Sequence, residues 1–371
     1  MTAIHQFLPT FAPRDAIGTH ALQVRRVLRD MGVESEIYAK GIVRGRALAP
    51  VASVARPYRA FARRRPGATG PTWLLYQLST GSEVADFVLA RPEPKLVNYH
   101  NVTPASLFAA WEPHLASECA LGRRQLRALA PWVELGIAVS GFNRSELDEA
   151  GYGRTAVAPV LADLDRGTAP DPAVRDRLAG ARDQGGSDWL FVGRVAPHKC
   201  QHDVVRAFAV YRRVYDPRAR LHLVGGPGSN AYVTTLERYV ASLGLAGAVR
   251  LTGSVPAGAL RAHFEATDVF VCLSEHEGFC VPIVEAMRHG VPVVAYAATA
   301  VPETVAGAGV LLESKDPLTV AAAVHRVLED GALRDQLVAA GARRAEDFTL
   351  ARATRRFTEV IGSFLAEQGA A

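Results

Sequence analysis

Short apolar runs alternate with amphipathic stretches along most of this chain, and the alternation restricts the fold more than any other feature of the sequence. In the N-terminal half, strands are predicted at 3–8, 36–39, 73–77, 95–99 and 136–140, with helices at 18–31, 105–120 and 122–130. In the C-terminal half, strands are predicted at 189–192, 220–224, 249–252, 269–273, 292–296 and 309–311, with helices at 201–215, 231–243, 257–266 and 282–289. Strands that alternate with helices over short connections form parallel sheets with right-handed crossovers.

A polar stretch rich in Pro and Gly separates the two series, and 371 residues are too many for one ordinary core. We therefore expect an α/β protein with two Rossmann-like, doubly wound parallel-sheet domains that face each other across a cleft. The predicted boundaries are an N-terminal domain over 1–165, a linker over 166–187 and a C-terminal domain over 188–349. Because ligands of open α/β sheets bind at the carboxyl ends of the strands, functional residues are expected there.

Composition narrows the choice of partners only slightly. The formal net charge of +5 suits an anionic partner but is small for this length. The basic residues form no stripe interleaved with aromatic residues, so no nucleic-acid partner is expected. The four cysteines include no CxxC pair, which indicates reduced thiols in a cytoplasmic protein.

Membrane contact, if it occurs, is expected to be peripheral and at the inner face. No apolar run approaches the roughly 20 residues that span a bilayer. Pro9, Pro13 and Arg14 interrupt the opening apolar run, which argues against a secretory signal. The arginine run between Arg56 and Arg65 is open to two interpretations, a rim for a lipid-linked or anionic acceptor and a solvated, mobile loop.

The segment 274–285 follows the predicted strand 269–273 and leads into a helix. A glycine in this turn lets backbone approach a ligand, and Pro282 suits the first helical turn because it lacks an N–H. Backbone N–H groups at the start of a helix, with the helix dipole behind them, bind anions. The sequence therefore predicts a diphosphate site at the N–H groups of Gly278, Phe279 and Cys280.

Two glutamates flank that turn. Glu285, about one turn into the helix, is placed to bind ribose hydroxyls, and Glu277 lies in the loop before it. The alternative is that Glu285 only complements the helix dipole and that Glu277 is a solvated acid.

A second polar loop, 193–199, follows the predicted strand 189–192. Gly193 permits the turn, while Arg194 and Lys199 bring two positive charges close to one point at the sheet edge. Two such cations can neutralise a leaving diphosphate without a metal ion. The alternative is a surface loop that happens to be basic.

The two motifs together, Glu277-Gly-Phe-Cys-Val-Pro-Ile-Val-Glu285 with Gly193-Arg194 and Lys199, resemble glycosyltransferase family 4, the retaining, glycogen-synthase-like group 1 enzymes of the GT-B architecture. The likeness covers about residues 189–348. It implies that Arg194 and Lys199 bind the donor diphosphate, that Glu285 binds the nucleotide ribose and that Glu277 binds hydroxyls of the donor sugar. It also places the nucleotide base near Gly225–Gly226 and Ser254–Val255. Cys280 departs from the family, which usually has glycine there.

The N-terminal half resembles the family more loosely. The resemblance implies that this domain lies on the acceptor side, that a final helix within 350–371 crosses back to it, and that Gly18 lies near the donor phosphate. It matches His100 to a histidine beside the transferred sugar and Ser140 to a serine at the end of a strand. The alternatives are a helix-entry residue for His100 and a simple helix cap for Ser140.

Several other functions lack their motifs. Asp163-Leu164-Asp165 spells the acidic motif of metal-dependent transferases but lies in polar linker sequence. No G-x-G-x-x-G follows the first strand, and His276-Glu277 has no second histidine four residues on. The histidines and cysteines lack zinc spacing, so neither metal nor cofactor is expected beyond the nucleotide-sugar co-substrate.

The predicted function is that of a retaining hexosyltransferase acting in glycan biosynthesis. The resemblance makes GDP-mannose and UDP-hexoses the leading donors, with a glycan, lipid-linked or small-molecule acceptor. The catalytic candidates are His100, Glu277, Arg194 and Lys199. The rival functions are a sugar-nucleotide epimerase or a phosphorylase of the same fold, and a scaffold that binds nucleotide sugars without turnover.

Overall fold

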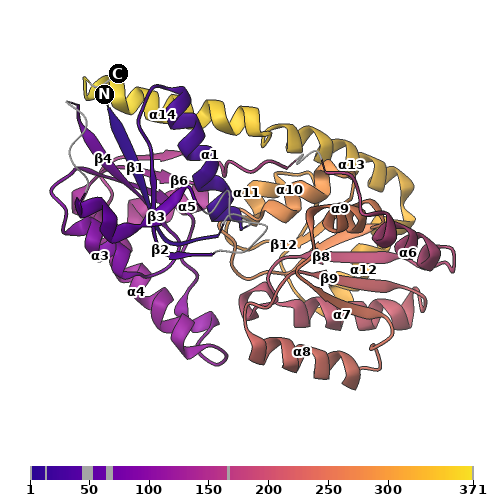
Figure 1. Cartoon of the computed structure of the whole chain (residues 1–371). Coiled ribbons are helices and arrows are strands. Elements are labelled where there is room, and N and C mark those ends of the chain that lie inside the picture. Colours follow the sequence, from indigo (N-terminus) through magenta and orange to yellow (C-terminus); the bar gives the residue numbers. More distant parts are fainter. Residues whose placement is uncertain (1, 13–14, 44–52, 64–69, 165–167, 370–371) are drawn as a thin grey trace. The chain divides into compact units, whose positions relative to one another are not determined.

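The computed structural model describes residues 2–12, 15–43, 53–63, 70–164 and 168–369. The chain forms two compact units, shown in Figure 1. Unit 1 comprises Met1–Ser106, His114–Asp163 and Thr349–Ala371, and unit 2 comprises Leu107–Pro113 and Leu164–Phe348. Among the described residues, none of the helices has the length and apolar character needed to cross a bilayer.

Unit 1 contains a seven-stranded parallel sheet with the order β3-β2-β1-β4-β5-β6-β7. The strands are β1 (Ala3–Phe11), β2 (Ile37–Ile42), β3 (Ala55–Pro57), β4 (Thr72–Leu78), β5 (Lys95–Tyr99), β6 (Val133–Ala138) and β7 (Thr155–Val157). Its helices are α1 (Ala16–Asp30), α3 (Glu83–Leu89), α4 (Pro113–Leu129), α5 (Gly141–Glu149) and α14 (Leu350–Glu367).

The helix α14, far from unit 1 in sequence, is part of its core. Phe357 and Phe364 are fully buried, and the Phe364 ring packs edge-on against Trp73 of β4 with centroids 5.6 Å apart. The Arg356 side chain donates a hydrogen bond to the Val157 carbonyl of β7 at 3.1 Å. The helix α14 is therefore grouped with unit 1, although all of unit 2 except Leu107–Pro113 lies between them in the sequence.

Unit 2 contains a six-stranded parallel sheet with the order β10-β9-β8-β11-β12-β13. The strands are β8 (Asp188–Val192), β9 (Arg220–Val224), β10 (Val249–Gly253), β11 (Val269–Cys272), β12 (Val293–Tyr296) and β13 (Val310–Leu312). The helices are α6 (Pro172–Arg182), α7 (Gln201–Val214), α8 (Asn230–Ser242), α9 (Ala257–Glu265), α10 (Val281–Arg288), α11 (Val301–Val305), α12 (Pro317–Glu329) and α13 (Gly331–Glu346).

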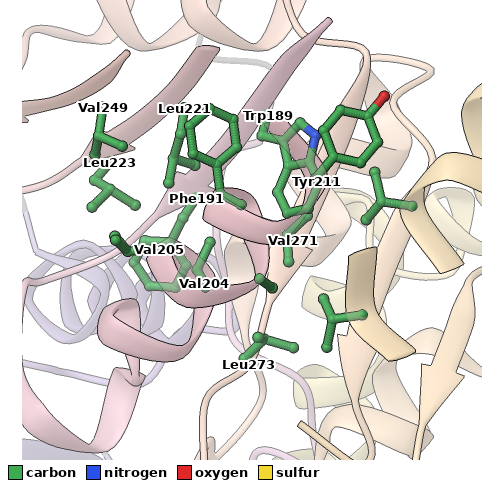
Figure 2. Close-up of a cluster of buried hydrophobic side chains, with 14 of the residues drawn as sticks. Trp189, Phe191, Val204, Val205, Tyr211, Leu221, Leu223, Val249, Val271 and Leu273 are labelled. Atoms are coloured by element: carbon green, nitrogen blue, oxygen red, sulfur yellow. The ribbon is translucent and has the colours of Figure 1, made fainter. Parts of the chain in front are cut away.

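The core of unit 2 lies between one face of this sheet and the helices α7, α8 and α12. Figure 2 shows its centre, where Trp189 of β8 and Tyr211 of α7 lie side by side, with ring centroids 5.0 Å apart. Both faces of a parallel sheet are covered by helices, so its strands are apolar throughout. This is why the runs at 189–192 and 269–273 could be assigned as strands from sequence.

Three segments differ from the prediction. The helices expected at 105–120 and 122–130 are one helix, α4, preceded by a 3₁₀ turn at Ala105–Leu107. Gly122 does not end α4; it brings the helix close to another loop, because a Cβ there would lie 2.7 Å from the Gly81 nitrogen. The predicted linker contains α6, which packs on α9 within unit 2.

The arginine-rich segment is also structured where it is described. Residues 55–63 form the edge strand β3 and a 3₁₀ helix, Tyr58–Arg63, whose Tyr58 and Phe61 side chains are buried. This part is therefore a short strand and a 3₁₀ helix anchored by two aromatic side chains, while Arg56, Arg59 and Arg63 are exposed. Arg64 and Arg65 lie outside the described residues.

Candidate active site

The loops that follow β8, β9 and β10 meet through their backbones. Gly193 donates its N–H to the Val224 carbonyl at 2.9 Å, and Gly225 donates its N–H to the Gly253 carbonyl at 3.0 Å. A Cβ on Gly225 would lie 2.0 Å from the Gly193 carbonyl oxygen, closer than any side chain tolerates. Gly193 and Gly225 are therefore required for these three strand ends to converge.

Lys199 projects from the loop after β8 toward the loop after β11. Its Nζ lies 2.6 Å from Oε1 of Glu277, and only 17% and 8% of the two side chains are exposed. Burial, the largest single effect, would lower the pKa of Lys199, but the Glu277 carboxylate together with Cys280 and Cys272 outweighs burial and raises the pKa. Lys199 is therefore a firmly charged cation held at the carboxyl ends of two neighbouring strands.

Arg194, in the same loop, differs from Lys199 in its surroundings. Its side chain is exposed, and within the described parts of the chain its guanidinium forms no salt bridge. Its carbonyl is fixed by the Gln201 side chain at 2.9 Å, so the backbone is held while the guanidinium can reach a ligand. Buried His198 lies between the two cations in sequence. Its pKa is held well below the usual range by burial and then by Lys199 and Arg194, which keeps it neutral.

The loop after β11 is anchored through its backbone. Glu277 donates its N–H to Oγ1 of Thr299 at 2.9 Å, and the Thr299 hydroxyl donates to the Glu277 carbonyl at 2.9 Å. Thr304 fixes the Phe279 carbonyl at 2.5 Å. The loop is thus held on both sides of Gly278.

Cys280 is the N-cap of α10 and has a left-handed backbone, with φ 70° and ψ 65°. Glycine adopts this conformation without strain, whereas cysteine has a Cβ that makes it costly. The thiol points to Cys272 at the end of β11, 3.9 Å away. The backbone turn needed for a helix N-terminus beside Glu277 is therefore formed in spite of the substitution.

Glu285 and Val255 lie at the edge of this arrangement. Glu285, on α10, lines a pocket of about 370 Å³ together with Leu260, Arg261, Arg288, His289 and Glu346. Val255 is half-buried in the loop after β10. The strand-end loops thus gather Gly193, Arg194, Lys199, Gly225 and Glu277, while Glu285, one turn along α10, lines this pocket.

The candidates Gly18 and His100 belong to unit 1. Gly18 donates its N–H to the Asp15 carboxylate at 2.6 Å, and a Cβ there would lie 2.0 Å from the Ala12 carbonyl oxygen. Its glycine identity is thus explained by the tight entry to α1. Ser140 caps α5 by accepting the Asn143 N–H at 3.1 Å, which is the simple-cap alternative considered for it.

His100 follows β5 and ends a directed chain of hydrogen bonds. Gln6 donates to the Ala21 carbonyl at 3.0 Å, and Gln77 donates to Oε1 of Gln6 at 2.8 Å. Oε1 of Gln77 therefore faces Nε2 of His100, 2.6 Å away, so Nε2 carries the proton and donates it. Burial lowers the pKa of His100 to about 3, so its ring is neutral and Nδ1 is a hydrogen-bond acceptor.

The residues that position His100 and Glu277 were not predicted from the sequence. Gln6 and Gln77 lie inside strands, and Thr299 lies in a loop with φ 52°, so no motif distinguishes them. A polar residue within an otherwise apolar buried strand is the one signal that could have found the glutamines.

Comparison with known proteins connects these features to a family. Residues 176–344 match the family model described as glycosyl transferases group 1. D-inositol 3-phosphate glycosyltransferase of Geodermatophilus obscurus is 39% identical over 202 residues, which cover 52% of this chain and 43% of that protein. GDP-mannose-dependent alpha-(1-6)-phosphatidylinositol monomannoside mannosyltransferase of Mycobacterium tuberculosis is 32% identical over 235 residues, which cover 60% of this chain and 59% of that protein. The chain therefore spans about half the length of the curated relatives it matches.

Two solved structures share the fold over nearly the whole chain. Anabaena HepE in complex with UDP and glucose has a TM-score of 0.75 at 18% identity, covering 98% of this chain and 100% of that chain. Sucrose-phosphate synthase from Thermosynechococcus elongatus has a TM-score of 0.76 at 17% identity, covering 99% and 100%. These likenesses establish the two-Rossmann GT-B fold.

Proposed function

Since residues 176–344 match the family model described as glycosyl transferases group 1 and the chain has the GT-B fold, we propose that this protein is a retaining glycosyltransferase that transfers a hexose from a nucleotide-diphosphate sugar. The observation that carries the proposal is the 2.6 Å pair between Lys199 and Glu277. It joins the carboxyl ends of the adjacent strands β8 and β11, where open α/β sheets bind ligands. The Lys199 ammonium suits a phosphate, and the Glu277 carboxylate suits a sugar hydroxyl.

The donor diphosphate binds Lys199, Arg194 and the start of α10. As the sugar leaves, negative charge develops on the departing diphosphate, and these preorganised positive groups stabilise it. Such stabilisation is commonly worth several kcal/mol. In this proposal the two side-chain cations do the work that a metal ion does elsewhere, and no metal is required.

Glu277 binds hydroxyls of the donor sugar and Glu285 binds the nucleotide ribose. An incoming diphosphate competes with Glu277 for Lys199, which turns the carboxylate toward the sugar. GDP-mannose and UDP-hexoses are the leading donors, because one relative's name specifies GDP-mannose and one structural neighbour was solved with UDP and glucose.

We assign the transfer a same-face course. The bond between the anomeric carbon and the diphosphate oxygen breaks, and the acceptor oxygen forms its bond to the same face of that carbon. The proton of the acceptor hydroxyl passes to the departing phosphate oxygen. His100 contributes a neutral ring whose Nδ1 accepts a hydrogen bond from a sugar hydroxyl.

The acceptor is a glycan, a lipid-linked sugar or a small polyol. The names of two relatives, which include inositol phosphate and phosphatidylinositol monomannoside, support a polyol bearing phosphate. For a lipid-linked acceptor the protein acts at the inner membrane face, where vesicle association should fall as salt is added. Indifference to salt would remove the electrostatic basis of that association.

A thermal-shift screen against UDP, GDP, ADP, TDP and their sugars tests the donor site. A ligand at 100 times its dissociation constant stabilises the fold by about 2.7 kcal/mol. One nucleotide should raise the melting temperature of the wild type and should not raise that of the Arg194→Ala or Glu285→Ala variant. The exposed Arg238 of α8 provides a matched control, and Arg238→Ala should respond like the wild type. If no nucleotide stabilises folded protein, the diphosphate site and the transferase proposal are both wrong.

The reaction class is then tested with the identified donor. NMR of the product should show the donor's anomeric configuration, and an inverted product would contradict the same-face course. An epimerase would consume donor without acceptor, and a phosphorylase would require free phosphate. A scaffold would bind the donor and never turn it over.

A further inference from the structure

Two buried thiols and a buried carboxylate lie together at the start of α10. Cys272 is the last residue of β11, Cys280 is the N-cap of α10, and Glu277 lies on the loop between them. The two Sγ atoms are 3.9 Å apart, and these sulfurs and a Glu277 carboxylate oxygen all lie within 4.8 Å of one another. All three residues are at least nine-tenths buried.

The sulfur spacing matches a shared metal ion better than a disulfide. Two thiolates bound to one tetrahedral zinc ion at about 2.3 Å lie roughly 3.8 Å apart. A disulfide requires about 2.05 Å, so each sulfur would have to move inward by almost 1 Å in a fully packed site. The backbone cannot easily supply that movement, because Thr299 and Thr304 fix the loop and Cys280 already has a left-handed conformation.

We propose that Cys272, Cys280 and Glu277 bind one thiophilic divalent cation, such as Zn²⁺ or Cd²⁺, at the donor-binding loop. Two thiolates and one carboxylate form a donor set that selects such ions over Mg²⁺ and Ca²⁺, which prefer oxygen ligands. Three protein ligands leave a fourth tetrahedral position for water.

Binding of the cation exchanges protons for metal charge. Binding releases one proton from each thiol, so the cation replaces two protons and two thiolates face it. Affinity should therefore fall as the pH falls.

A second cluster in the same unit serves as an internal comparison. Cys200, His202 and Asp203 also place three ligand atoms within 4.8 Å, but Lys315 occupies that cluster. Its Nζ lies 3.4 Å from Sγ of Cys200 and 2.8 Å from Asp203. Lys315 thus contacts two of the three ligand groups of that cluster, whereas Lys199 is hydrogen-bonded to one ligand group of the proposed site, the Glu277 carboxylate. In the proposed site Lys199 pairs with the Glu277 carboxylate, and the sulfurs contact each other and Ser274.

Binding should antagonise the donor, a consequence that rests on the proposed function. The cation and Lys199 compete for the Glu277 carboxylate, and the proposed sugar contact requires the same carboxylate. A nucleotide sugar and the cation should therefore each weaken the binding of the other.

Titration with Cd²⁺ alone tests the site without any assumption about catalysis. Wild-type protein should develop the ultraviolet charge-transfer absorption of thiolate-bound cadmium, saturating at one equivalent with release of two protons. Zn²⁺ should displace the Cd²⁺, and a chelator should reverse the signal. Absence of this absorption in folded protein whose four thiols are shown to be reduced would overturn the proposal.

Variants locate the ligands. Cys280→Gly removes one thiol and relieves the left-handed backbone, so it should fold and should lose tight binding by at least 10-fold. Cys272→Ser should do the same. Cys119→Ala, a buried thiol of α4, and Cys200→Ser are matched controls that should titrate like the wild type. An unchanged cadmium titration in Cys280→Gly would place the metal elsewhere and contradict the proposal. If Cd²⁺ binds as expected but does not inhibit transfer, the site stands and the proposed role of Glu277 fails.

Discussion

Nε2 of His100 donates a hydrogen bond to Oε1 of Gln77 at 2.6 Å. The direction of this bond is set by the Ala21 backbone carbonyl, to which Gln77 is linked through Gln6. Because the Ala21 carbonyl can only accept, Gln6 and then Gln77 have only one consistent orientation. His100 is therefore kept as one neutral tautomer before any substrate arrives. Gln77 acts as a positioning residue for a group that the proposed reaction requires as a hydrogen-bond acceptor.

Gln77→Leu should lower kcat by on the order of 10²-fold, because the His100 ring loses its fixed tautomer and orientation. Nucleotide binding, measured by thermal shift, should be unchanged. Gln77→Glu should instead raise the pKa of His100 by placing a carboxylate beside Nε2, which NMR of the ring would report. Gln125→Leu, a buried glutamine of α4 elsewhere in unit 1, controls for lost stability. If both leucine variants reduce kcat equally, Gln77 has no positioning role.

Lys199→Met should reduce the free energy of unfolding by roughly 3 kcal/mol, because it leaves a buried Glu277 carboxylate without its partner. The double variant Lys199→Met with Glu277→Gln should recover part of that loss. Urea unfolding measures the stability of the single and the double variant. Arg326→Met breaks an exposed pair with Asp330 and should cost less than about 1 kcal/mol. Equal losses for the buried and the exposed pair would contradict the assigned burial.

Gly225→Ala should destabilise unit 2 by about 2–3 kcal/mol, since its methyl group would overlap the Gly193 carbonyl. The displaced loop should also lose the thermal shift caused by the donor. Gly247→Ala is the matched control, because a Cβ there meets no atom within 4 Å, and it should change stability by less than about 0.5 kcal/mol. A Gly225→Ala variant that is as stable as the wild type would show that the strand-end loops tolerate separation.

Stability should fall as the pH is lowered from 6.5 toward 4, in part because of His263. Burial, with smaller effects of His222, Arg177 and Arg250 and against that of Asp188, lowers the pKa of His263 to about 4. Between these values the unfolded chain binds a proton that the folded chain does not, so each pH unit costs at most about 1.4 kcal/mol. In the His263→Leu variant, the urea concentration at the midpoint of unfolding should change less with pH between 6.5 and 4 than it does in the wild type. A variant that keeps the full wild-type slope would exclude His263 as its source.

The strands and the strand-end loops could be predicted because each depends on local sequence. The run Val269–Cys272 is apolar at every position, as a strand covered on both faces must be, and Pro282 marks the first turn of the helix that follows. Lys199 and Glu277 could each be placed at a strand end for the same reason.

What could not be predicted depends on contacts between distant segments. Lys199 and Glu277 are separated by 78 positions, so their direct pairing appears only in the folded chain. Gly122 looks like a helix terminator unless its contact with the Gly81 loop is known. The segment Leu107–Pro113 belongs to unit 2 because Trp111 packs on Tyr232 and Phe108 on His198, which no local pattern indicates.

The position of α14 in the sequence has a consequence for synthesis. Ile4, Trp73 and Leu96 are buried beneath this helix in the core of unit 1, yet a ribosome makes α14 only after all of unit 2. While Leu164–Phe348 is emerging and can already fold, the first sheet still presents an uncovered apolar face to solvent. At roughly 5–20 residues per second, that face stays exposed for many seconds in each nascent chain. The unit that is translated first is thus the last to be completed, and until then the apolar residues that α14 will cover can aggregate.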